Sequence, residues 1–291
     1  MDYFVSPTAS RLASGRAGSI AVITPYIARW YFSTVLSGIE RVLRPSDLDL
    51  VLLAVGDPSD RDSTPPLRKL RGRVDGVIVI SLSADEEHVS DVLEMGLPMS
   101  GVGPTLPGVG VVSIDDVHGA MVATQHLINL GHRRIGLIHG REGFAPFDVE
   151  RDRHSGFRAA LAEAGLDEDK ALEVPGHFHI DGGEHAMNEL LSRRQPPTAV
   201  FCISDEMAFG ALRSLRKHGL RAGEDVSVVG FDDHDMSDIL DLTTVAQPVQ
   251  QLGELAAEVL LAQLEDPGAT PPPRMLATRL IVRGSSRPLC R

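Results

Sequence analysis

Ser19-Ile20-Ala21-Val22-Ile23-Thr24-Pro25 is an apolar run of strand length, and it has a counterpart in the second half of the chain, Arg134-Ile135-Gly136-Leu137-Ile138-His139. Each run follows a short basic lead-in and precedes a segment of helical period. The same order of strand and helix therefore begins twice, which predicts two lobes of similar structure.

Apolar runs of strand length alternate with helical segments along almost the whole chain. Strands are predicted at 19–24, 49–55, 75–80, 97–102, 110–114, 134–139, 198–203, 226–231, 243–247 and 276–282. Helices are predicted at 31–44, 85–95, 116–130, 149–164, 182–194, 204–218 and 249–265. Near-continuous Val, Ile and Leu runs are typical of strands buried on both faces. The predicted fold class is therefore α/β, with two similar lobes, each a doubly wound parallel sheet.

The predicted domains are not continuous in sequence. We expect an N-terminal lobe of residues 17–131 and 245–268, and a C-terminal lobe of residues 132–244 and 269–291. Residues 1–16 are expected to form a separate short helix. A ligand is expected in the cleft between the lobes, beyond the carboxyl ends of the strands.

Composition limits where this chain works and what it contacts. The net charge is −12, and residues 1–16 contribute +1, so the acidic remainder repels a phosphate backbone. Only two cysteines occur, and no export signal or run of 18 apolar residues is present. We expect a cytoplasmic protein without a disulfide framework or a membrane partner.

The N-terminal segment predicts a short basic helix that contacts DNA. Ser6 can cap it, Pro7 suits its first turn, and Gly15 can end it. The arginines suit phosphates, and an apolar side chain between them suits a wedge in the minor groove. The expected DNA-contacting residues are Ser10, Arg11, Leu12 and Arg16. The alternative is a frayed terminal linker.

Polar and aromatic side chains that follow the predicted strands are the candidate ligand contacts. Carboxylates and a guanidinium form forked hydrogen bonds with vicinal hydroxyls, and aromatic faces cover the apolar face of a sugar. The candidates are Trp30, Tyr31, Phe32, Asp115, Arg153, Ser204, Asp205 and Asp232. The alternatives are that Asp116 and Asp205 cap helices and that the three aromatic residues belong to the core.

At these residues the chain resembles the LacI/GalR family of bacterial transcription regulators. The matching stretches follow the family's order over essentially all 291 residues. They are Ser6–Arg16, Gly18–Pro25, Leu130–Gly136, Arg153–Leu166, Pro197–Phe201, Ser204–Ala211, Asp225–Asp233 and Leu242–Pro248.

The resemblance implies a homodimeric, sugar-responsive regulator whose core folds like type I periplasmic sugar-binding proteins. A small-molecule effector, expected to be a sugar, would control the binding of operator DNA allosterically. The resemblance assigns Arg153 and Asp232 to the effector clamp and Leu12 to the minor-groove wedge. Ser204 stands where the family usually has Asn, which leaves the effector open. No catalytic residue, metal or cofactor is implied.

Other functions match fewer features of the sequence. Gly101-Val102-Gly103 begins like a dinucleotide-binding motif, but the third glycine is missing, and Pro104 and Pro107 interrupt the helix that should follow. No spacing of nucleophile and base indicates an enzyme. A cytoplasmic sensor without a DNA-binding head, or a solute-binding protein of the same fold, remains the alternative.

Two further expectations concern particular side chains. Val35, Leu36 and Ile39 are expected to form a dimer face, unless they pack in the core. Replacement of Arg153 by Ala is expected to remove effector binding and to leave the fold intact, because the expected partner of this side chain is the ligand.

In this family a helix-turn-helix head precedes the hinge segment, and the sequence ahead of Tyr3 does not hold one. We therefore expect the chain as printed to show no tight, sequence-specific binding to an operator in a gel shift. A specific shifted complex formed by this chain would contradict the expectation.

Overall fold

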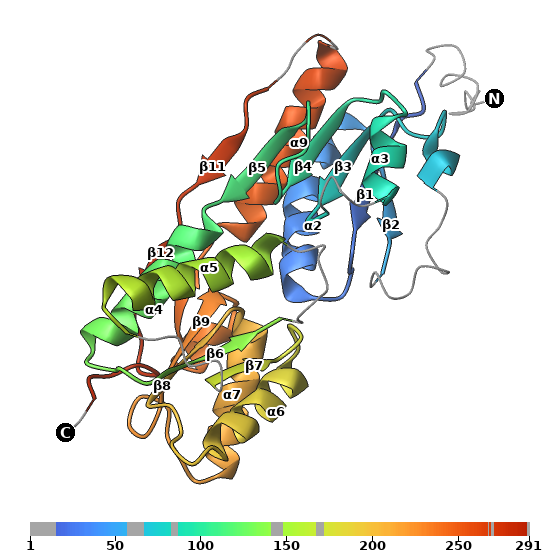
Figure 1. The fold of residues 1–291 in the computed structure, drawn as a ribbon. Helices are drawn as coiled ribbons and strands as arrows, with labels where there is room; N and C mark the ends of the chain where they lie inside the picture. Colours follow the sequence, from blue (N-terminus) through green and yellow to red (C-terminus); the bar gives the residue numbers. More distant parts are fainter. Residues whose placement is uncertain are drawn as a thin grey trace. The chain divides into compact units, whose positions relative to one another are not determined.

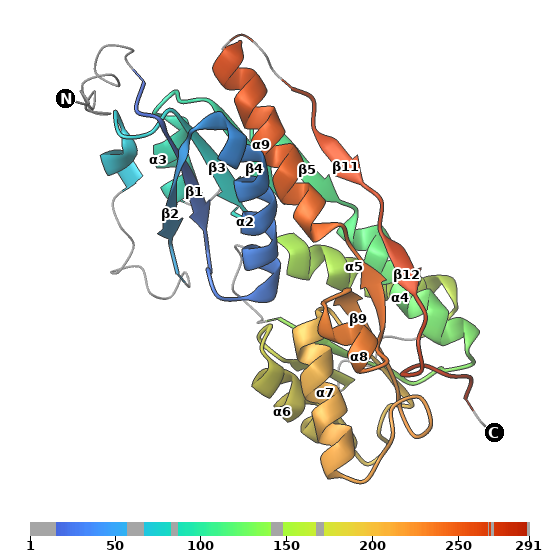
Figure 2. The same cartoon turned by 180° about the vertical axis from the view of Figure 1, so that it is seen from behind.

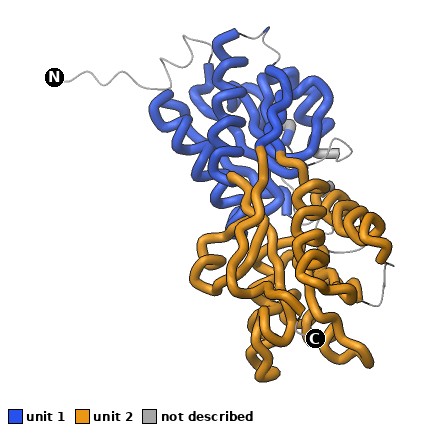
Figure 3. The backbone as a smooth tube through the Cα atoms, turned by 90° about the vertical axis from the view of Figure 1, so that its left-hand side faces the viewer, with its two compact units in different colours: residues 1–113, 249–276 blue, residues 114–248, 277–291 orange. Residues whose placement is uncertain are grey.

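The computed structural model describes residues 16–56, 67–82, 87–140, 148–166, 172–266, 268 and 271–289. The chain divides into two compact units, shown in different colours in Figure 3. Unit 1 comprises residues 1–113 and 249–276, and unit 2 comprises residues 114–248 and 277–291. The predicted hinge residues Ser10, Arg11 and Leu12 lie outside the described residues.

Unit 1 contains a six-stranded sheet with the order β11-β5-β4-β3-β1-β2. Its strands are β1 (Ser19–Thr24), β2 (Asp49–Ala54), β3 (Gly76–Ile80), β4 (Met99–Val102), β5 (Gly110–Ile114) and β11 (Arg274–Leu276). The first five pair in parallel, and Ile20 lies opposite Leu50 on one side and Gly76 on the other. The strand β1, all six residues of which are buried, therefore lies inside the sheet, where both of its neighbours protect its backbone groups.

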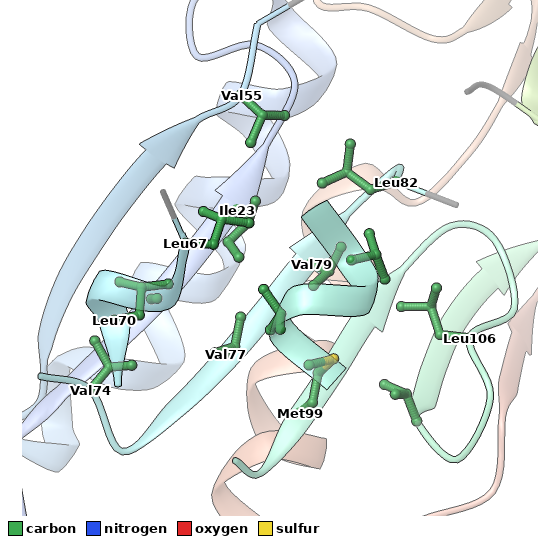
Figure 4. Close-up of a cluster of buried hydrophobic side chains, with 14 of the residues drawn as sticks. Ile23, Val55, Leu67, Leu70, Val74, Val77, Val79, Leu82, Met99 and Leu106 are labelled. Atoms are coloured by element: carbon green, nitrogen blue, oxygen red, sulfur yellow. The ribbon is translucent and has the colours of Figure 1, made fainter. Parts of the chain in front are cut away.

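Helices cover both faces of the unit 1 sheet. They are α2 (Trp30–Leu43), α3 (Glu87–Leu93) and α9 (Val249–Glu265), with short 3-10 turns at Arg44–Ser46 and Leu67–Leu70. Figures 1 and 2 show α3 on one face and the pair α2 and α9 on the other. Ala21 and Ile23 join the apolar cluster beneath α3 (Figure 4), whereas the alternate residues Ile20 and Val22 point to the opposite face and are equally buried.

Unit 2 repeats this architecture with the sheet order β12-β10-β9-β8-β6-β7. Its strands are β6 (Ile135–His139), β7 (Glu173–Pro175), β8 (Ala199–Cys202), β9 (Ser227–Asp232), β10 (Thr243–Ala246) and β12 (Arg279–Ile281). Its helices are α4 (Asp116–Asn129), α5 (Asp148–Glu163), α6 (Ile180–Leu191), α7 (Asp205–Lys217) and α8 (Met236–Ile239). β6 pairs in parallel with β7 and β8, and β9 pairs in parallel with β8 and β10. β12 runs antiparallel to β10. The predicted class of two similar parallel-sheet α/β lobes is confirmed.

Three predicted features differ from the structure. The strand predicted at 276–282 is two strands, β11 in unit 1 and β12 in unit 2, separated by Ala277 and Thr278. The short elements β7 and α8 were not predicted. The helix α4, expected in the N-terminal lobe, belongs to unit 2 because it packs on α5 and against β8, β9, β10 and β12. The structural boundaries therefore lie at 113/114, 248/249 and 276/277.

Glycines bring three pairs of helices into backbone contact. A Cβ atom at Gly253 of α9 would overlap the Val35 carbonyl of α2. A Cβ atom at Gly156 of α5 would overlap the Val117 carbonyl of α4, and α6 and α7 approach each other through Gly183 and Gly210 in the same way. These contacts set the helix separations, because no other residue lacks the Cβ atom.

The contact between α2 and α9 also corrects the predicted dimer face. Val35 and Ile39 are fully buried, so they belong to the core of unit 1 and are not available to a second copy. No helix in the described ranges has the length and apolar character needed to cross a membrane.

We expect Gly253→Ala to lower the free energy of unfolding by about 2 kcal/mol in a urea titration. Alanine favours a helix by about 1 kcal/mol over glycine, but the added methyl group meets a backbone carbonyl that cannot rotate away, and such overpacking costs more. The exposed neighbour Gln251→Ala is the control and should change stability by less than about 0.5 kcal/mol. An unchanged midpoint for Gly253→Ala would show that the two helices move apart freely.

Candidate functional site

Arg153 lies on α5 in unit 2 and is 4% exposed. Its Nε donates to Asp116 Oδ1 at 2.8 Å, and its Nη1 donates to the Ile203 carbonyl at 2.5 Å. The guanidinium lies over the Phe231 ring, with Cζ 3.6 Å from the ring centroid. Arg153 therefore connects α5 to α4, to the end of β9 and to the segment that follows β8.

The two aspartates after β5 have different roles. Asp115 is exposed and caps α4, since its Oδ1 accepts a hydrogen bond from the His118 amide at 2.8 Å. Asp116 is the residue that pairs with Arg153. Burial raises the pKa of the Asp116 carboxyl, and the Arg153 charge opposes this rise. The structure thus shows Asp115 as the cap of α4 and places Asp116 beside Arg153, whereas effector contact by Asp115 stays a prediction.

Asp232 ends β9 and lies on the other side of the same guanidinium. Its Oδ1 is 3.5 Å from Arg153 Nη1 and accepts a hydrogen bond from Gln247 Nε2 at 2.6 Å. Burial raises the pKa of the Asp232 carboxyl to about 7, with Arg153 opposing the rise and Asp205 adding to it. Its φ of 128° is a strained backbone conformation for a residue with a side chain, and such strain occurs at functional sites.

Gln247 was missed in the sequence-based site. The signal that identifies Asp232 also applies to it, because Gln247 follows the end of β10 just as Asp232 ends the neighbouring β9. Its amide is buried, and in the described structure it supplies the 2.6 Å hydrogen bond to Asp232.

The Asp205 carboxylate is occupied by the protein itself. Its Oδ1 accepts from the Thr244 hydroxyl at 2.6 Å, and its Oδ2 accepts from the Ser237 hydroxyl at 2.7 Å and the His234 amide at 2.9 Å. The side chain is fully buried, and this burial raises the pKa of the Asp205 carboxyl. Asp205 therefore holds the β9–α8 segment and β10 in place, and its direct contact with an effector stays a prediction.

Ser204 caps α7, since its hydroxyl accepts a hydrogen bond from the Met207 amide at 3.4 Å. The capping role that was considered for Asp205 and Asp116 is thus filled by the residue that precedes each of them. Gly230 on β9 makes room for the Asp205 carboxylate, because a Cβ atom at position 230 would overlap Asp205 Oδ1.

The predicted aromatic residues of unit 1 open α2, after the carboxyl end of β1. Phe32 is buried and makes edge contacts with Tyr31 and Tyr26 at centroid distances of 5.2 Å and 5.7 Å. Trp30 and Tyr31 are partly exposed. The core alternative therefore applies to Phe32, whereas Trp30 and Tyr31 keep surface that a ligand can use.

Two histidines and two glutamates form a partly buried array that was not predicted. His139 Nδ1 lies 3.2 Å from Glu150 Oε1, and His154 Nε2 lies 2.8 Å from Glu173 Oε2. The two imidazole rings stack with a centroid distance of 5.8 Å. The described residues contain no cluster of three or more His, Cys, Asp or Glu side chains placed to hold a metal ion.

Arg16, the predicted hinge residue that the structure describes, donates to the Leu264 carbonyl at 3.4 Å.

A family model described as a periplasmic binding protein-like domain matches residues 124–286. The transcriptional repressor CytR of Escherichia coli is 32% identical over 99% of this chain and 85% of its own length. The structure of a LacI family transcriptional regulator from Enterococcus faecium, with bound ribose, has a TM-score of 0.83 and 31% identity. That match covers 94% of this chain and 100% of the other. The chain belongs to the LacI family.

A second LacI-like neighbour is the structure of a CelR–cellobiose complex, with a TM-score of 0.82 and 32% identity over 97% of this chain and 92% of that one. Membership of the LacI family confirms the resemblance drawn from the sequence. These relatives are named as transcriptional regulators, and the chain is a regulator's effector-binding core rather than an enzyme.

The burial of Arg153 changes the expected effect of its removal. We now expect Arg153→Ala to lower the free energy of unfolding by about 3 kcal/mol, because the carboxylates of Asp116 and Asp232 lose their shared cation. A urea titration at neutral pH measures the loss. Arg151→Ala, on an exposed arginine of the same helix, is the control and should cost less than about 1 kcal/mol. Equal losses in the two variants would refute the structural role of Arg153.

The raised pKa of Asp232 predicts a pH dependence with a defined sign. Folded protein keeps a proton on Asp232 up to about pH 7, whereas an unfolded chain releases it near pH 4 (pKa about 3.9). The contribution of this group to stability is therefore complete below about pH 4 and is lost as the pH rises through about 7.

An Asp232→Asn variant lacks this contribution at every pH. In urea titrations, the free energy of unfolding of the variant minus that of the unmodified chain should rise by about 2 kcal/mol as the pH increases from about 5 to about 7. Asp238→Asn, on an exposed side chain of the same segment, is the matched control. A stability difference that stays constant over this range would mean that Asp232 keeps one protonation state.

Proposed function

We propose that this LacI-family chain binds a small polyhydroxylated effector, of the sugar class, at the carboxyl-terminal edge of the unit 2 sheet. The observation that carries the proposal is the buried Arg153 guanidinium, held between Asp116 and Asp232 beside the ends of β8 and β9. In open parallel sheets, ligands bind at this edge. The structural neighbours with ribose and with cellobiose support a sugar as the effector class.

Fixed donors and acceptors suit a sugar better than an apolar ligand. The Asp232 carboxylate accepts hydrogen bonds from ligand hydroxyls, and Gln247 offers an amide beside it. Arg153 orients Asp232 and keeps the carboxylate in the conformation that its strained backbone requires. We retain Trp30 and Tyr31 as proposed effector contacts from unit 1, because partly exposed aromatic faces suit the C–H surface of a sugar.

We further propose that effector binding changes the affinity for operator DNA, with a coupling free energy of about 1–3 kcal/mol that acts equally in both directions. Ser10, Arg11, Leu12 and Arg16 remain the proposed DNA contacts. A regulator that binds a two-fold symmetric operator works as a dimer, so we propose a homodimer acting in the cytoplasm.

The melting temperature of the chain, measured with a panel of pentoses, hexoses, disaccharides and nucleosides, tests the proposal. A ligand at one hundred times its dissociation constant adds about 2.7 kcal/mol, which shifts the midpoint by several degrees. The Asp232→Asn variant should weaken binding of the hit by about ten- to a hundredfold, since a charge-assisted hydrogen bond is lost. Asp235→Asn, three residues further along, is the exposed control. A hit that Asp232→Asn leaves unchanged places the effector elsewhere.

A further inference from the structure

We infer that the effector is an uncharged polyol, and that sugars carrying a carboxylate or a phosphate are excluded from this site. The inference rests on the proposed function and narrows it from sugars in general to neutral ones. It is carried by the pairing of the cations and by the excess of carboxyl groups at the carboxyl-terminal edge of the unit 2 sheet.

The first cation at this edge is already neutralised. Arg153 uses Nε for Asp116 and Nη1 for the Ile203 carbonyl, and a second carboxylate, Asp232, lies 3.5 Å from Nη1. One face of its guanidinium is covered by the Phe231 ring. An anionic ligand that approached Arg153 would therefore meet two carboxyl groups for each positive charge.

A second cation, Arg283, lies beside the start of β10, where its amide donates to Thr243 Oγ1, and its side chain pairs with the carboxylate next to Asp232. Its Nη2 donates to Asp233 Oδ1 at 2.9 Å, and its Nη1 donates to the Leu242 carbonyl at 2.8 Å. Its Nε is also 3.5 Å from Asp238 Oδ1. Arg283 thus compensates the carboxylate next to Asp232 and is not available to a ligand anion.

Among the described residues at this edge, carboxyl groups outnumber guanidinium groups. Five of them come from α4, α5, α7 and the end of β9: Asp116, Glu150, Asp205, Asp232 and Asp233. Glu150 is paired with His139, and Asp205 accepts only from uncharged donors. At pH 7.5, above the pKa of about 7 of Asp232, a ligand anion beside this buried carboxylate meets a like charge, so this edge disfavours a further negative charge.

The same edge is well suited to hydroxyl groups. Both side-chain contacts of the Asp232 carboxylate in the described structure are made by Oδ1, which leaves Oδ2 to accept from a ligand. A hydroxyl group donates to such an oxygen and accepts from an amide such as that of Gln247. At pH 7.5, above the pKa of about 7 of Asp232, a carboxylate or phosphate group offers acceptors and cannot donate to the ionised Asp232.

Matched ligand pairs test the inference on the unmodified chain. They are glucose with glucuronate, galactose with galacturonate, ribose with ribose 5-phosphate, and uridine with uridine 5′-monophosphate, titrated by calorimetry at pH 7.5. We expect the neutral member of at least one pair to bind, and its charged partner to bind at least about tenfold more weakly. Added salt should narrow the gap, because it screens repulsion.

Each outcome bears on a different statement. A charged member that binds as tightly as its neutral partner, or more tightly, overturns the inference and leaves the proposed function standing. If no member of any pair binds, the chain does not sense small polyols, and the proposed function is rejected together with the inference.

The variant Asp232→Asn separates charge from shape. It keeps the size of the side chain and removes one negative charge, so the preference for the neutral member should shrink at least threefold. Glu163→Gln removes the same charge from the exposed end of α5, about 15 Å along the helix from Arg153, and should leave the preference unchanged. Equal effects in the two variants would show that only the overall charge of the chain matters, and would overturn the role of the site.

Discussion

Arg153 is 4% exposed, and a guanidinium taken this far out of water is stable only where acceptors replace its hydration. The Asp116 carboxylate, the Ile203 carbonyl and the Asp232 carboxylate supply these acceptors. They come from α4, from the segment after β8 and from the end of β9. The requirement to pair one buried cation therefore fixes the relative positions of four elements of unit 2, and it places two carboxyl groups beside the carboxyl ends of its strands.

Small residues let these elements come close enough for the pairing to form. Gly156 seats α5 on α4, and Gly119 of α4 makes room for the Phe231 ring that lies against the Arg153 guanidinium. Gly230 leaves space for the Asp205 carboxylate, which in turn holds Thr244 and Ser237. Polar pairing and close backbone approach thus depend on each other: without the glycines the charged groups would be too far apart.

Most of the fold could be predicted from sequence, because buried parallel strands consist of short, near-continuous runs of Val, Ile and Leu that are easy to recognise. The prediction of one strand at 276–282 was wrong, because residues 274–281 form two strands in different sheets. The spacing of apolar residues along a strand does not show which strands it pairs with. The apolar pattern also failed for the dimer face at Val35 and Ile39, since an apolar helix face looks the same whether it meets the core or a second copy.

The candidate site was predictable in location but not in the division of roles. Asp232 was identified because it follows an apolar strand, and Arg153 because it lies in a predicted helix and matches the clamp of the LacI/GalR family. The structure places the two side chains 3.5 Å apart. Asp115 and Asp116 are adjacent and chemically identical, so only the direction of the helix start decides which one caps and which one pairs. The full internal hydrogen bonding of Asp205 depends on Thr244 and Ser237, which are more than thirty residues distant and carry no local signal.

The division of the last apparent strand between β11 and β12 means that the chain passes from one unit to the other at three separate points, near residues 113, 248 and 276. Neither unit corresponds to a single continuous stretch of gene. Recombination that exchanges one continuous block with a relative would carry over only part of a sheet, so the exchange of a whole unit needs two blocks from the same relative.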